Sequence, residues 1–166
     1  MTSQIMTEQF IAWAKAHNWD MKTFQRDAIS LPREVAKRYR VPNEYQQFLS
    51  RIRSCVNPAQ NQWFLCAEDY APKSEDEFRW NEFEIISLKA ADDEDDEDWK
   101  ATIRGFWDTH MPFFMSVEGV YEYYAFDLTE GSIVSGCEPE FEETKTIAKN
   151  FGEFLAKIIS GEIKTA

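Results

Sequence analysis

Carboxylates are the side chains with the clearest chemical potential in this sequence, which contains 30 Asp and Glu residues against 18 Lys and Arg. Seven are consecutive, and four more lie close together between residues 138 and 143. These eleven residues are Asp92, Asp93, Glu94, Asp95, Asp96, Glu97, Asp98, Glu138, Glu140, Glu142 and Glu143. Like charges at this density repel one another, so we expect the run 92–98 to be extended and solvated. Such a surface suits a cationic protein partner, and it is equally typical of an ordinary solvated face.

Other kinds of site are not indicated by residue type and spacing. The acidic run has oxygen ligands suited to Ca²⁺, but it lacks the glycine that turns an EF-hand loop. Cys55, Cys66 and Cys137 are spaced too widely for a zinc pair and are odd in number, so we expect buried free thiols. His17 and His110 each follow a predicted helix, where an imidazole interacts favourably with the dipole. We therefore predict no catalytic residue, no metal ion and no cofactor.

Asp127 is the one carboxylate with an aromatic context, because Tyr and Phe residues fill the preceding strand segment 121–126. Aromatic rings stack on sugars, and paired carboxylates hydrolyse glycosides, which leaves a carbohydrate-binding or enzymatic function open. The other interpretation is a strand-end carboxylate that accepts hydrogen bonds from the turn 129–131. We favour the second, and burial of the aromatic rings would remove the case for the first.

The distribution of charge excludes several classes of function. The net charge is −12, which argues against nucleic-acid binding, since phosphate contacts need clustered Lys and Arg. Residues 1–60 carry nine Lys and Arg against five Asp and Glu, whereas residues 61–166 carry nine against 25. There is no apolar stretch of about 18 residues and no signal-peptide pattern at the start, so we expect a cytoplasmic protein without a membrane partner.

The elements that must position these residues follow from hydrophobic periodicity. The predicted helices span residues 7–17, 32–36, 43–52, 98–107 and 147–159, and Thr7, Asn43 and Asp98 are the predicted N-caps of three of them. The predicted strands span residues 62–66, 83–88, 113–117, 120–128 and 132–137. Residues 55–61 are a predicted turn-rich link. This order indicates an α+β single domain with a mainly antiparallel central sheet of about five to six strands, helices packed against it and a long C-terminal helix.

Three segments, in this order, resemble the SUKH superfamily: a Pro-led helix with Tyr and Phe-Leu, a central hairpin with two glycines, and a closing Phe-x-x-Phe-Leu helix. Their residues are Pro42, Tyr45, Phe48, Leu49, Gly119, Tyr124, Phe126, Asp127, Gly131, Phe151, Phe154 and Leu155, with Trp107 as a structural position of the preceding helix. The superfamily includes the domain of a yeast cell-wall-synthesis regulator and many bacterial immunity proteins. The resemblance covers roughly residues 40–160.

The resemblance implies an α+β binding scaffold without shared catalytic residues, whose variable surface binds a protein. We therefore predict a non-enzymatic immunity or interaction protein that neutralises a cognate toxin domain, expected to be a basic nuclease, through the eleven carboxylates. The domain is expected to fill residues 1–166, with 1–40 as an N-terminal helical addition and 41–160 as the core. The alternatives are a small-ligand-binding or carbohydrate-binding domain or enzyme around Asp127, and a regulatory scaffold. The oligomeric state stays open.

Overall fold

Seven strands form one antiparallel sheet in the computed structural model, which describes residues 3–165. Each strand pairs with its neighbours along the chain, so the spatial order is β1 to β7. The strands are β1 (Asp20–Thr23), β2 (Ile52–Val56), β3 (Gln62–Phe64), β4 (His110–Ser116), β5 (Glu122–Asp127), β6 (Ser132–Cys137) and β7 (Lys145–Ala148). The predicted α+β class and antiparallel sheet are confirmed, with more strands than expected.

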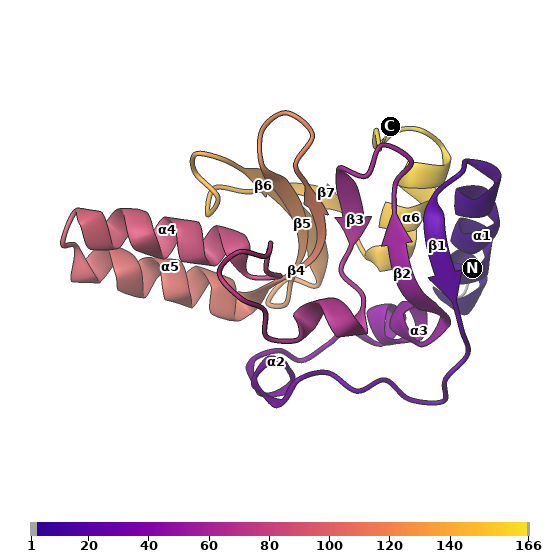
Figure 1. Cartoon of the computed structure of the whole chain (residues 1–166), viewed down its shortest axis with the longest axis horizontal. Coiled ribbons are helices and arrows are strands. Elements are labelled where there is room, and N and C mark those ends of the chain that lie inside the picture. Colours follow the sequence, from indigo (N-terminus) through magenta and orange to yellow (C-terminus); the bar gives the residue numbers. More distant parts are fainter. Residues whose placement is uncertain (1–2, 166) are drawn as a thin grey trace.

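The helices lie in two groups on either side of this sheet (Figure 1). They are α1 (Ser3–Ala16), α2 (Arg33–Arg38), α3 (Asn43–Arg51), α4 (Glu82–Asp93), α5 (Glu97–Thr109) and α6 (Phe151–Ile159), with a 3₁₀ turn, η1 (Ala67–Tyr70). Helices α1, α3 and α6 gather at one side, while α4 and α5 form an antiparallel hairpin that projects away from the sheet. The hairpin enters β4 directly, since α5 ends at Thr109 and β4 begins at His110.

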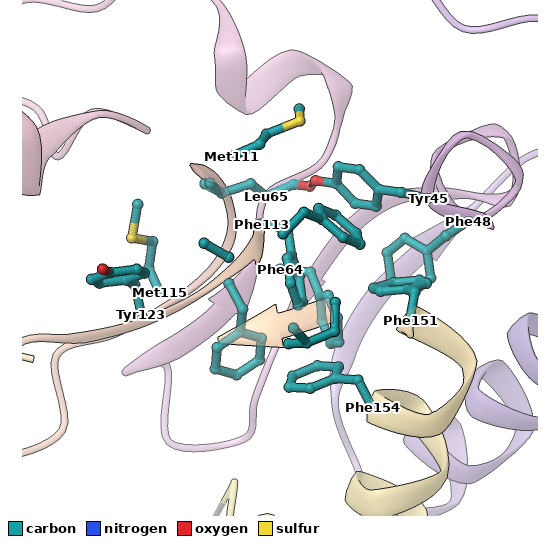
Figure 2. Packing of buried hydrophobic residues seen from close by; sticks show 14 of the residues in the cluster. Tyr45, Phe48, Phe64, Leu65, Met111, Phe113, Met115, Tyr123, Phe151 and Phe154 are labelled. Carbon is teal, nitrogen blue, oxygen red and sulfur yellow. Dashed lines mark hydrogen bonds between the residues drawn. The ribbon is translucent and has the colours of Figure 1, made fainter. Parts of the chain in front are cut away.

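One face of the sheet packs against α1, α3 and α6 through aromatic side chains. The ring of Phe64 in β3 lies 5.2 Å from Phe10 of α1, 4.8 Å from Phe48 of α3 and 6.2 Å from Phe154 of α6. All four rings are buried, and Figure 2 shows Phe48, Phe64 and Phe154 together on this side of the strands. Because three helices converge on one ring, the apolar stripes of α3 and α6 are enclosed in a single core.

The opposite face of the central strands is covered by the base of the hairpin. Tyr123 of β5 is fully buried, with its ring 4.9 Å from Trp107 of α5 and 5.8 Å from Phe83 of α4. Its hydroxyl donates a hydrogen bond to the carbonyl oxygen of Phe141, in the loop between β6 and β7. Since successive strand residues point to opposite faces, Tyr123 and its neighbour Tyr124 link the two layers through one strand.

Several predicted elements are confirmed. The meander β4–β5–β6 is present, and its two turns contain Gly119 and Gly131 with φ angles of 79° and 77°. Such positive φ angles are accessible to glycine at little cost. The aromatic and leucine residues that carried the resemblance in the Pro-led helix and the closing helix are buried: Tyr45, Phe48, Leu49, Phe151, Phe154 and Leu155. Trp107 is buried as well.

The predicted strand 83–88 is wrong, because this segment forms the first half of α4. The short run of Phe and Ile is typical of a strand when taken alone. However, Phe83, Ser87 and Ala91 are buried at intervals of four residues, which is the helical period. The helix-forming residues that follow, Lys89, Ala90 and Ala91, continue the helix into the acidic run.

The acidic run is therefore not an extended loop between a strand and a helix. Asp92 and Asp93 end α4, and α5 begins at Glu97. Asp95 has a φ angle of 55°, a left-handed conformation that Asp tolerates better than most residues. The N-cap of α5 is Asp96, whose Oδ1 accepts a hydrogen bond from the amide of Trp99 at 3.0 Å, so the prediction of Asp98 as the cap is wrong. The run therefore forms a tight turn between two helices despite the repulsion between its carboxylates.

Other predicted boundaries also move. The C-terminal helix begins at Phe151 with Asn150 as its cap, because residues 145–148 form β7 beside β6. The predicted link at 55–61 overlaps β2. At the predicted N-caps, Thr7 lies inside α1, and Asn43 is the first residue of α3. Cys137 is exposed at the end of β6, contrary to the expectation of a buried thiol, whereas the other two cysteines are buried.

We predict that Gly136→Ala destabilises the protein by about 1–3 kcal/mol, because over-packing a full site forces its neighbours apart. Gly136 pairs with Tyr123, and a Cβ atom there would lie 2.6 Å from the Tyr123 hydroxyl and 2.7 Å from the Phe141 carbonyl oxygen. Gly105→Ala is the matched control. Gly105 is an exposed glycine inside α5 with open space around it, so this variant is expected to gain about 0.5–1 kcal/mol. Urea unfolding measures both, and an unchanged midpoint for Gly136→Ala would contradict the packing described.

Candidate partner-binding groove

A groove runs between helix α4, the start of α5 and the loop that joins β6 to β7. Its cavity volume is about 390 Å³. We call it the hairpin groove, and its lining residues are Ile86, Ser87, Ala90, Trp99, Pro139, Glu140, Phe141, Glu142 and Glu143. Trp99 directly follows the acidic run, and the other wall carries three carboxylates of the second acidic cluster. The groove is therefore lined by the second acidic cluster and by the residue that directly follows the acidic run.

Apolar side chains in this groove are unusually accessible. Ile86 is 37% exposed and Trp99 is 40% exposed, which places them among the few large hydrophobic residues of the domain that face solvent. Both lie on the hairpin and line the same cavity. Large apolar side chains beside a polar rim are typical of protein interaction sites.

Glu142 fixes the loop wall of the groove to the hairpin. Its Oε2 atom accepts hydrogen bonds from Ser87 Oγ at 2.8 Å and from Trp107 Nε1 at 2.9 Å. These donors belong to α4 and α5, so one carboxylate joins three segments. Glu142 is half-buried and occupied by these contacts, and we assign it to the architecture of the groove.

The other carboxylates of the second cluster have different environments. Glu138 Oε1 accepts a hydrogen bond from the amide of Tyr121 at 2.8 Å, so this side chain is also used by the fold. Glu140 and Glu143 are exposed on the groove. A hydrogen bond between their side chains, together with the repulsion of like charges, raises the pKa of the Glu143 carboxyl. This pair therefore presents concentrated negative charge that a cation would stabilise.

The seven residues of the acidic run also divide into two groups. Lys100 makes ion pairs with Asp92 and with Glu97, and the hydrogen bond from Lys100 lowers the pKa of Asp92. Asp96 is the helix cap described above. Within residues 3–165 the other four form no ion pair, and they are exposed: Asp93, Glu94, Asp95 and Asp98.

The base of the hairpin is held by a partly buried ion pair. Arg38, at the end of α2, donates to both carboxylate oxygens of Glu84 at 2.8 and 2.7 Å and to Asp108 at 3.0 Å. Burial alone would lower the pKa of the Arg38 guanidinium, but the hydrogen bond and attraction to these carboxylates raise it above its usual value. Glu84 and Asp108 belong to α4 and α5, so Arg38 ties both helices to the body of the domain.

A family model for the SMI1 / KNR4 family (SUKH-1) matches residues 34–157. The chain belongs to this family. The match extends from α2 to α6 and contains the whole hairpin and its groove. No curated protein and no solved structure matches the chain.

The first helix and strand of this SUKH-1 protein precede the matched region, and they are integrated with it. Helix α1 packs against α3 and α6, and β1 pairs with β2 over residues 20–23. The division into an addition at 1–40 and a core at 41–160 stays a prediction.

Asp127, the last residue of β5, has the structural role that we favoured in this SUKH-1 protein. Its Oδ1 accepts hydrogen bonds from the amides of Thr129 at 3.0 Å and Glu130 at 3.1 Å. Tyr123 and Phe126 are buried, whereas Tyr121, at the start of the aromatic segment, is 36% exposed. A cavity of about 310 Å³ is lined in part by Asp127 and Phe126, and a ligand site there stays a prediction.

The histidines and the buried cysteines also have structural environments. Nδ1 of His17 lies 2.7 Å from the carbonyl oxygen of Trp13, and Nδ1 of His110 lies 2.8 Å from that of Phe106, which confirms the helix-end interpretation. Burial raises the pKa of the Cys55 and Cys66 thiols, which keeps them protonated and weakly nucleophilic. Among residues 3–165, no cluster of three metal-ligating side chains occurs, and no helix is long and apolar enough to cross a bilayer.

Sequence patterns placed the acidic residues correctly as charged segments, but they did not reveal the groove that Trp99 and the second acidic cluster line. Ile86 and Trp99 were missed because each was assigned to the core of a predicted element. The helical repeat of Phe83, Ser87 and Ala91 was the signal that could have identified α4 and left Ile86 on its outer side.

We predict that Glu142→Ala destabilises the SUKH-1 domain by about 1–3 kcal/mol, because the buried Trp107 indole N–H loses its acceptor. Glu142→Gln should lose less, since its amide oxygen can still accept one of the two hydrogen bonds. Glu140→Ala is the control on the same loop and should stay within about 0.5 kcal/mol of the parent, as exposed substitutions do. Urea unfolding followed by tryptophan fluorescence tests this order, and equal effects of Glu142→Ala and Glu140→Ala would refute the anchoring role.

Proposed function

We propose that this SUKH-1 protein is a non-enzymatic immunity protein that binds and neutralises a toxin domain, expected to be a basic nuclease. The observation that carries the proposal is the hairpin groove, in which the exposed Ile86 and Trp99 lie with carboxylates of the second acidic cluster, while Trp99 directly follows the acidic run. Membership of the SUKH-1 family is consistent with an immunity-type protein. The binding surface would consist of the exposed part of the acidic run, Asp93, Glu94, Asp95 and Asp98, together with Glu140 and Glu143.

The physical basis is electrostatic complementarity. A nuclease binds phosphates in a basic cleft, and an acidic protein is steered toward such a cleft at rates that fall as salt screens the charges. Steering alone is not specific, so the accessible Trp99 and Ile86 would supply the desolvated contacts that hold the complex. The two buried thiols, Cys55 and Cys66, suit a reducing cytoplasm, where such an immunity protein would act.

The decisive experiment starts from the neighbouring reading frame: where it encodes a large secreted protein with a small basic C-terminal domain, that domain is co-expressed with this chain. Rescue of growth and a purified complex would support the proposal. If the toxin domain killed the host equally with and without this chain, and no complex formed at low salt, the proposed function would be refuted for that pair.

The contribution of the acidic run is tested with a fourfold variant, D93N/E94Q/D95N/D98N, which leaves the ion-paired and capping residues intact. We expect association with the toxin domain to slow by about tenfold at low salt, because long-range steering is lost. The difference should shrink as ionic strength rises. Stopped-flow fluorescence measures the association rate.

The matched control removes four exposed carboxylates elsewhere, D27N/E34Q/D76N/E130Q. Its net charge changes by the same amount, so a similar loss in both variants would mean that only total charge matters. An unchanged association rate of D93N/E94Q/D95N/D98N at low salt would show that the acidic run is solvated surface alone.

A further inference from the structure

The hairpin groove has a composition that selects among cationic partners. Its lining combines the apolar side chains of Ile86, Ala90, Trp99 and Phe141 with the exposed carboxylates of Glu140 and Glu143. A strongly hydrated cation would interact only with the carboxylates. A side chain that combines an apolar stem with a charged planar head could use both parts.

The carboxylate pair also indicates where the charge of that side chain would lie. Glu140 and Glu143 line the same cavity and belong to one turn, in which the amide of Glu143 donates a hydrogen bond to the carbonyl oxygen of Glu140 at 3.1 Å. In the free protein the two like charges repel each other, and a guanidinium between them would replace this repulsion with two charge-assisted hydrogen bonds. Glu142 anchors the intervening loop to α4 and α5, so the pair sits on a fixed wall.

We infer that the hairpin groove binds an arginine side chain of the protein partner, with its guanidinium between Glu140 and Glu143 and against the exposed Trp99. This assignment rests on the proposed function, since it names the chemistry of the residue that the partner inserts. Arginine suits the groove better than lysine for two reasons. Its planar head bonds carboxylates in a fixed geometry, and it is weakly hydrated and stacks on indole rings. A cavity of about 390 Å³ is within the size range of sites that enclose small ligands.

The test uses three short peptides that differ in one side chain: acetyl-Gly-Arg-Gly-amide, its lysine counterpart and its citrulline counterpart. Citrulline has nearly the shape of arginine but carries no charge. Each peptide is titrated into the ¹⁵N-labelled full chain, and chemical shifts of the Trp99 indole and of the amides of residues 140–143 are followed. We expect saturable shifts with arginine, weaker binding with lysine and no shifts with citrulline.

Two double variants separate the groove from general charge attraction. E140Q/E143Q should weaken the binding of the arginine peptide by about tenfold or more, as expected when hydrogen bonds to a charged group are lost. D27N/D76N removes the same amount of charge from exposed positions that do not line the groove and should leave the affinity within about twofold, because screening confines attraction to near charges. Both pairs are exposed, so unchanged spectra elsewhere verify folding. Trp99→Ala should also weaken binding of the arginine peptide. Because this variant lacks the indole signal, its binding is followed through the amides of residues 140–143.

The outcomes also distinguish this inference from the proposed function. Equal losses in the two double variants, or equal binding of arginine and citrulline, would overturn the arginine site. If the toxin domain still bound the parent protein in that case, the proposed function would stand. Saturable, arginine-selective shifts without any toxin complex would support the site and count against the immunity role.

Discussion

Both faces of strand β5 must be covered, and this constraint shapes the domain. Tyr124 contacts Phe154 of α6 with ring centroids 4.9 Å apart, while Tyr123 points into the opposite layer against Phe83 and Trp107. The first face is covered by helices that lie across the sheet. The second is covered by the base of the α4–α5 hairpin together with Phe141 of the β6–β7 loop. The outer part of that hairpin extends beyond the sheet, where it has no core to bury (Figure 1). A charged turn is compatible with that position because no apolar surface has to be enclosed there.

Carboxylates in the hairpin change roles with distance from the sheet. At the base, Glu84 of α4 pairs with the partly buried Arg38, and Glu142 of the adjoining β6–β7 loop accepts a hydrogen bond from the buried Trp107. Farther out, Lys100 is held between Asp92 and Glu97. At the turn, Asp93, Glu94 and Asp95 are exposed and form no ion pair among the described residues. The same residue type therefore supports the fold at one end of the hairpin and is available for recognition at the other, with Lys100 limiting repulsion where the two helices begin to separate.

Sequence reasoning succeeded where one period dominated a segment. The alternating strands of the meander and the burial of Tyr45, Phe48 and Leu49 follow from local patterns, and so does the family resemblance. It failed where a tertiary contact decided the outcome. Residues 83–88 satisfy strand preferences locally, but Phe83 stacks on Phe141 with ring centroids 4.5 Å apart, a contact between segments far apart in the chain. The groove was unpredictable for the same reason, because its walls meet only after the β6–β7 loop folds back on α4. Single-sequence patterns carry little information on such long-range pairing.

The hairpin turn lies at one extreme of the long axis of the molecule, and α1 and β1 lie toward the other (Figure 1). Since residues 1–60 are net basic and residues 61–166 strongly acidic, this arrangement gives the protein a permanent electric dipole moment directed along its length. In the field of a cationic surface such a body experiences a torque as well as a pull. It therefore rotates toward a turn-first approach before any atoms touch, and a larger share of random collisions occurs in one orientation. The position of the acidic turn at the end of a projecting helical hairpin thus orients the whole molecule in the electric field of a cationic partner.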